Sequence, residues 1–202
     1  MNTKKSIGIA ALAGILVLGL SACSTTEHPT AKVTHAVAKA TPTPTPTPDG
    51  TSAHPYPQGT VTVTDLGSQW DVTLTNLNTN ATATVQAQDQ YATLTAGSQY
   101  LMGTLTVQVN KNIQTKYVGQ TTSVYFSVGP VYVGGDGKVY DSSSDVNSSA
   151  ALTSNWYSQP DIVDNVGVKV AGDFAFAVPT AAIVGGHFGV ENLTSNKIVY
   201  FQ

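Results

Sequence analysis

The chain of 202 residues contains no arginine and a single cysteine, and only 10% of its residues are charged. All nine of its basic residues are lysines. Nucleic-acid binding depends on cations clustered against phosphates, so this composition argues against nucleic acid as a partner. It also provides no basic patch to hold an anionic membrane surface. One cysteine cannot form an internal disulfide, so the fold has to be stabilised by its core alone.

Long hydrophobic runs are also absent. The longest apolar stretch, from Ile7 to Leu20, is shorter than the roughly 20 residues that a membrane-spanning helix needs. Lys4 and Lys5 precede this stretch and small residues follow it, which is the arrangement of a secretory signal peptide. The lone cysteine lies in Leu20-Ser21-Ala22-Cys23, which resembles the bacterial lipobox.

The lipobox resemblance implies cleavage before Cys23, whose sulfur then carries a diacylglycerol thioether. Residues 1–22 are thus a lipoprotein signal peptide, and the partner of the mature N-terminus is the membrane. We expect a lipid-anchored (palmitate-type) protein on the extracellular face of the cell membrane of a Gram-positive bacterium. Two acyl chains hold a protein on a bilayer where one chain binds only marginally. An ordinary secretory signal and a retained transmembrane anchor are the alternatives.

Residues 23–58 show no apolar periodicity and are predicted to be a disordered, Thr/Pro-rich linker. Four Thr-Pro repeats over residues 41–48 favour extended polyproline II backbone. The segment is therefore interpreted as a stalk, and its threonines are typical O-glycosylation sites. Its histidines, His28, His35 and His54, are interpreted as solvated side chains.

From residue 59 to residue 202 the apolar residues recur with period two, as in half-buried antiparallel strands. Short alternating segments separated by Gly, Asn and Asp turns predict an all-β, immunoglobulin-like antiparallel β-sandwich. We expect Trp70 to be the central aromatic residue of its core, surrounded by Phe126, Phe174 and Phe176. No amphipathic helix of ordinary length is predicted, although residues 150–156 favour a short helical turn.

Four segments follow one another in an order that resembles a known family: Trp70–Leu74, Ala96–Asn110, Asp136–Tyr140 and Val170–Pro179. Behind a lipobox and a Thr/Pro stalk, they are similar to the telokin-like extracellular domain of unknown function. The resemblance implies an immunoglobulin-like fold in a lipoprotein of a Gram-positive bacterium. It implies no catalytic residues, because the family has none established.

Chemistry-bearing residues are sparse. The sequence has no Gly-x-Ser-x-Gly, His-Glu-x-x-His or Gly-x-x-x-x-Gly-Lys motif. His187 is the one histidine after residue 58, and a lone histidine is more often structural than catalytic. Asp136, Asp141 and Asp145 lie in one turn-rich stretch whose oxygens suit calcium. Alternatively, these aspartates stabilise turns by accepting bonds from their own backbone. Another acidic pair is Asp161 and Asp164.

These features predict a non-catalytic binding or interaction domain on the cell surface, with no cofactor and with a protein or cell-wall component as a further partner. An exposed strand edge of a sandwich can accept another chain. A calcium- or small-ligand-binding protein that uses the region from Asp136 to Asn147 is the alternative. A cell-wall hydrolase acting through His187 or paired aspartates is the third reading.

Overall fold

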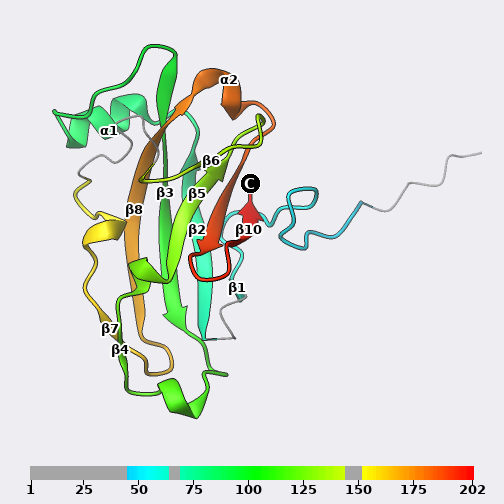
Figure 1. Cartoon of the computed structure of the whole chain (residues 1–202), viewed down its shortest axis with the longest axis vertical. Helices are drawn as coiled ribbons and strands as arrows, with labels where there is room; N and C mark the ends of the chain where they lie inside the picture. The colour runs from blue at the N-terminus through cyan, green and yellow to red at the C-terminus, as the bar shows by residue number, and fades with distance from the viewer. Residues whose placement is uncertain (1–44, 64–68, 144–151) are drawn as a thin grey trace, which may run out of the picture. The chain divides into compact units, whose positions relative to one another are not determined.

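The computed structural model describes residues 45–63, 69–143 and 152–202. The first of its two main sheets has the strand order β1-β2-β3-β8 and is antiparallel throughout. Its strands are β1 (Thr62–Val63), β2 (Trp70–Asn78), β3 (Ser98–Val109) and β8 (Lys169–Pro179). Because β3 and β8 pair over their whole length, they form the longest ladder of this sheet (Figure 1).

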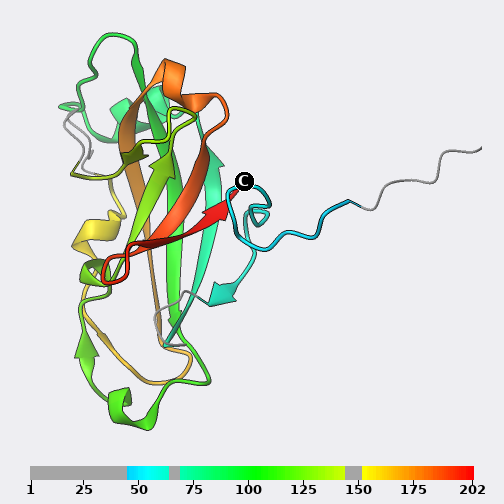
Figure 2. The ribbon, with the colours of Figure 1, turned by 45° about the vertical axis from the view of Figure 1, so that its right-hand side comes forward.

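The second main sheet has the order β10-β9-β5-β6 and is also antiparallel. Its strands are β5 (Val128–Val133), β6 (Val139–Tyr140), β9 (His187–Asn192) and β10 (Lys197–Phe201). It packs face to face on the first sheet, as the turned view in Figure 2 shows. The orders β2-β3-β8 and β10-β9-β5-β6 correspond to A-B-E and G-F-C-C′ of an immunoglobulin-like sandwich, and β1 is an additional strand at the edge next to β2. The predicted fold class is confirmed.

The remaining elements are short. A small third sheet pairs β4 (Thr121–Thr122) with β7 (Ile162–Val163). The α-helices are α1 (Thr82–Gln88) and α2 (Thr180–Ile183), and the 3-10 turns are η1 (Thr115–Tyr117), η2 (Val124–Phe126) and η3 (Trp156–Ser158). None of the helices in the described ranges has the length and apolar character needed to cross a bilayer.

The main core lies between the two large sheets. On β3, Leu101, Leu105 and Val107 are fully buried, so the period-two face expected from the sequence is the inner one. Aromatic rings fill the centre, where Phe174 stacks on Phe176 at 5.5 Å and meets Phe188 edge-on at 6.2 Å. Burial at roughly 25 cal/mol per Å² of apolar surface makes this the main stabilising term.

Two of the expected core aromatics, Trp70 and Phe126, do not lie at the centre of the core. Trp70 is buried, as predicted, but it is the first residue of β2 and pairs with Val109 at the end of β3, so Phe174 takes the central place. Phe126 was predicted to be buried, and this is wrong, because its side chain is 70% exposed. Val124 and Phe126 share a face only in a strand; in the 3-10 turn η2 they point in different directions.

A smaller cluster covers the outer face of the first sheet. Helix α1 places Ala81 and Val85 against Tyr100 of β3 and Ala175 of β8. The helical turn expected over residues 150–156 is found at η3 instead, with residues 150 and 151 outside the described ranges.

The segment Asp49–Gln58, which we call the strap, was expected to belong to the disordered linker. In the structure it lies along β10 (Figure 1). Tyr56 N–H donates to Tyr200 O at 2.9 Å, and Gln202 N–H donates to Tyr56 O at 2.9 Å. The Tyr56 ring lies 6.0 Å from the fully buried Phe201 ring. Residues just before the predicted boundary at residue 58 therefore pair their backbone groups with the edge of β10. The boundary itself stays a prediction.

Candidate functional site

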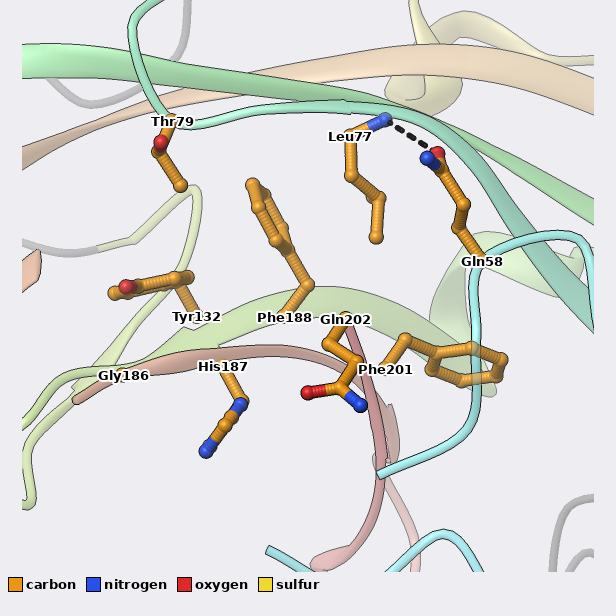
Figure 3. A pocket seen from close by; sticks show the side chains of 9 residues that line it. All are labelled: Gln58, Leu77, Thr79, Tyr132, Gly186, His187, Phe188, Phe201 and Gln202. Carbon is orange, nitrogen blue, oxygen red and sulfur yellow. Dashed lines mark hydrogen bonds between the residues drawn. The ribbon is translucent and has the colours of Figure 1, made fainter. Parts of the chain in front are cut away.

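One cavity, the His187 pocket, lies where the start of β9 meets the end of β2. It has a volume of about 230 Å³. The residues that line it are Gln58, Leu77, Thr79, Tyr132, Gly186, His187, Phe188, Phe201 and Gln202. In Figure 3 Phe188 points toward Leu77 and Thr79, whereas His187 points to the other side of its strand, as alternation along β9 requires. The Tyr132 hydroxyl donates to Ile183 O at 2.7 Å, so the pocket combines apolar walls with neutral polar groups.

A neighbouring cavity of about 350 Å³ lies between the strap and the same end of β9. Both His54 and His187 line it. His54, which was interpreted as a solvated residue of the linker, lies in the strap with its side chain 39% exposed, and its Nδ1 lies 3.7 Å from Asp49 Oδ2. In the described part of the chain, no group of three or more His, Cys, Asp or Glu side chains is placed to hold a metal ion.

The third cavity, the Glu191 pocket, differs from the other two in its chemistry. It has a volume of about 220 Å³ and lies over the outer face of the second sheet, where β5 and β9 pair. The residues that line it are Tyr125, Phe126, Gly129, Pro130, Val131, Asp141, Ser142, Tyr157, Glu191 and Leu193. Three aromatic rings and two carboxylates thus surround one space that contains no basic side chain.

Each side chain of the Glu191 pocket has a clear structural origin. Gly129 and Glu191 are direct cross-strand partners in the β5–β9 ladder, so both lie on its outer face. Turn η2 supplies Tyr125 and Phe126, whose rings are 4.2 Å apart. Turn η3 supplies Tyr157, and Asp141 follows directly after β6.

The electrostatics of this pocket disfavour negative charge. Burial, and after it the neighbouring Asp141 carboxylate, raise the pKa of Glu191 above its ordinary value. Burial raises the pKa of Tyr157 to about 12, with a further contribution in the same direction from Asp141 and an opposing one from the Ser142 hydrogen bond. A cation placed here would therefore be stabilised by two carboxylates that lack full solvation.

Two of the three aspartates predicted to bind calcium, Asp136 and Asp141, accept hydrogen bonds within their own turns. Burial acts to raise the pKa of Asp136, but hydrogen bonds from Lys138 N–H and the Tyr140 hydroxyl outweigh this effect. The pKa of Asp136 is therefore lowered. These bonds measure 3.2 Å to Oδ1 and 2.9 Å to Oδ2. Asp141 Oδ1 accepts from the backbone and hydroxyl of Ser143, both at 2.8 Å. Asp145 lies outside the described residues. The two described aspartates therefore form the turn contacts of the alternative interpretation.

The second acidic pair is divided between two environments. Asp161 accepts a hydrogen bond from the Ser123 hydroxyl at the surface. Asp164 is fully buried, and its Oδ2 accepts from Gln69 Nε2 at 2.8 Å and from Thr122 Oγ1 at 2.7 Å. Asp164 thus joins β4 to the start of β2 and serves the fold. The proposed lipidation residue, Cys23, lies outside the described residues.

Sequence reasoning did not predict the Glu191 pocket. Asp141 was considered as a calcium or small-ligand residue or as a turn-forming aspartate, and Tyr125, Tyr157 and Glu191 were not considered at all. One signal was present: Glu191 is the only glutamate after Glu27, and it interrupts an apolar strand. Its convergence with Asp141 depends on the β5–β9 register, which the sequence does not provide.

Comparison with known proteins found no relative: no family model, curated protein or solved structure matches the chain. The resemblance to the telokin-like extracellular domain stays a prediction.

Proposed function

We propose that this chain is a non-catalytic binding domain, anchored by a lipid on Cys23 to the extracellular face of a bacterial cell membrane. The observation that supports binding is the Glu191 pocket, an open cavity of about 220 Å³ on the outer face of a sheet. Ligand sites are concave, mostly apolar, and carry a few polar groups that fix orientation. This pocket has aromatic walls, two carboxylates and the hydroxyls of Ser142, Tyr125 and Tyr157.

The order of the chain supports a surface location. A leader and lipobox come first, Thr-Pro repeats follow, and the sandwich comes last. The strap ties the end of the stalk to β10 through four backbone hydrogen bonds, in which Gly50, Tyr56 and Gln58 pair with Tyr200 and Gln202. The anchored end of the chain is therefore joined to the edge of the sheet that bears the pocket.

Two measurements test the proposal. Intact-mass analysis of the native protein should show a chain that begins at Cys23 and carries two or three acyl groups. A photoreactive benzoyl-phenylalanine at position 126, on intact cells, should crosslink to an envelope component. The same group at Tyr91, an 80% exposed aromatic outside the pocket, should not. An unmodified Cys23 would overturn the anchor, and equal crosslinking at both positions would overturn the binding site.

The calcium-dependent alternative has weaker support. Asp136 and Asp141 already accept local hydrogen bonds, and Asp136 also faces Lys138 Nζ at 3.9 Å. A wall hydrolase would need a nucleophile or general base next to a partner, as in acid–base catalysis. His187 shares its two cavities with amides, aromatic rings and His54, and with no carboxylate side chain.

A further inference from the structure

The charges of the side chains that line the Glu191 pocket indicate what kind of ligand it accepts. Its two charged side chains, Asp141 and Glu191, are both acidic, and none of its ten lining residues is basic. Charge complementarity therefore calls for a cationic ligand.

The aromatic side chains narrow the choice to an organic cation. Phe126 exposes 70% of its surface, although it is a large apolar residue, and its ring packs at 4.2 Å against Tyr125. An ammonium group within about 6 Å of an aromatic face is attracted by the ring quadrupole, and the effect grows as the cation loses solvent. A hard metal ion would gain little from these rings, because it requires six or more oxygen ligands.

We propose that the Glu191 pocket binds an alkylammonium group, with Glu191 and Asp141 accepting its charge and Phe126, Tyr125 and Tyr157 surrounding its carbon stem. The inference rests on the proposed function, because it names the ligand class of the same pocket. The chemistry is shared by a lysine side chain and an amino sugar.

The geometry leaves room for such a group beside Glu191. Its cross-strand partner is Gly129, which is buried but has no side chain to fill the space next to the carboxylate. The nearest atoms that a Cβ added at Gly129 would meet belong to Leu193, at 3.5 Å and beyond, which is ordinary contact. The space is therefore not needed for packing the sheet, and a larger residue could fill it.

The partial burial of the carboxylates supports the same conclusion. Burial and the neighbouring Asp141 raise the pKa of Glu191, which means that the surroundings of Glu191 destabilise its negative charge. A bound ammonium would relieve that repulsion and return the pKa of Glu191 toward its ordinary value. The pocket thus has more to gain from a cation than a solvated surface carboxylate has.

Binding can be tested with the isotopically labelled full-length chain. Nα-acetyl-lysine methylamide is titrated while backbone NMR signals are followed, with Nα-acetyl-norleucine methylamide as the neutral control of similar shape. Glucosamine forms a second arm, and the amine that binds more tightly identifies the source. We expect saturable shifts at Gly129 and Glu191 with an amine and none with the norleucine compound. Equal shifts with the norleucine compound, or none with either amine, would overturn the proposal.

Matched variants separate the pocket from general charge effects. Glu191→Gln keeps the shape and should weaken amine binding at least about tenfold, the loss expected for a hydrogen bond to a charged group. Asp49→Asn removes one negative charge from the strap, outside the pocket, and should leave affinity unchanged. Phe126→Ala should weaken binding about two- to fivefold, and Tyr91→Ala should not.

Gly129→Val fills the cavity and should abolish binding while the folded spectrum is kept. If Glu191→Gln and Asp49→Asn weaken amine binding equally, the inference is wrong, because nonspecific electrostatic attraction would then explain the binding. Amine binding can fail while crosslinking at position 126 and acylation of Cys23 succeed; in that case the ligand class is wrong and the proposed function stands.

Discussion

Gly103 on β3 lies directly opposite Phe174 on β8, and a Cβ built on Gly103 would lie 2.6 Å from Cζ of the Phe174 ring. The same Cβ would lie 2.8 Å from Leu77 Cδ2. The ring therefore occupies the space that a side chain at position 103 would fill, and the missing side chain brings Phe174 to the centre of the core.

Gly103→Ala is accordingly expected to destabilise the fold by about 1–3 kcal/mol, the usual cost of overpacking a core. Urea denaturation measures the change. Gly129→Ala is the matched control, since the nearest atoms to that Cβ belong to Leu193, at 3.5 Å and beyond, and it should change stability by no more than about 0.5 kcal/mol. Gly103→Ala combined with Phe174→Leu should recover part of the loss. Equal effects of the two glycine substitutions would show that the Phe174 contact is unimportant.

The strands were predictable where their alternation was uninterrupted. Leu101, Leu105 and Val107 repeat every second residue, and all three are buried on one face of β3. The hairpin at Asp136–Tyr140 was predictable too, because its glycine turn joins two apolar segments; Gly137 has a φ of +78° there, and β5 pairs with β6. Local sequence controls these features.

The features that the sequence did not predict share a physical reason. Phe126 fits an alternating pattern with Val124, and only the 3-10 turn places it outside the core. Helix α1 buries little more than Val85, so its polar sequence carries no amphipathic signal. The Glu191 pocket joins residues from η2, β5, η3 and β9. These outcomes depend on tertiary contacts between distant segments, which a residue pattern does not encode.

Alkaline pH is expected to destabilise the protein through Tyr157. Its pKa is raised to about 12 in the fold, chiefly by burial, against 10.0 for the free side chain. The unfolded chain therefore loses this proton first, so the stabilisation is complete below pH 10 and is lost as pH rises toward 12. The loss attributable to this group is on the order of 2–3 kcal/mol.

Urea denaturation between about pH 8 and pH 11.5 measures this effect, and Tyr157→Phe should show a shallower decline. Tyr100, Tyr132 and Tyr140, whose pKa values burial also raises, contribute in the same direction in both proteins. The difference between the two curves therefore isolates Tyr157. Parallel curves would contradict the assignment.

Calcium is expected to leave thermal stability unchanged. Both oxygens of Asp136 and Oδ1 of Asp141 accept hydrogen bonds within their own turns. A ligand that binds only the folded state raises the melting temperature, by an amount set by its concentration relative to Kd. A thermal scan with about 5 mM calcium, compared with the same scan in chelator, should show no shift. A rise that disappears in Asp145→Asn would instead restore the predicted calcium site.

The strap is expected to be part of the stable domain. Removing it would leave the backbone groups of Tyr200 and Gln202 without their partners and expose the Phe201 ring, which is now fully buried. A chain that begins at residue 59 should therefore be less stable than one that begins at residue 45, by about 2–4 kcal/mol. Thermal unfolding of the two truncated chains measures this.

Tyr56→Ala in the longer chain distinguishes side-chain packing from backbone pairing. It removes the ring contact at 6.0 Å with Phe201 but keeps the hydrogen bonds from the strap, so it should cause only part of the loss. Because β10 is otherwise an edge strand, the shorter chain should also self-associate more readily, which light scattering would detect. If both truncated chains unfold at the same temperature, the strap does not stabilise the domain, and the domain begins at residue 59.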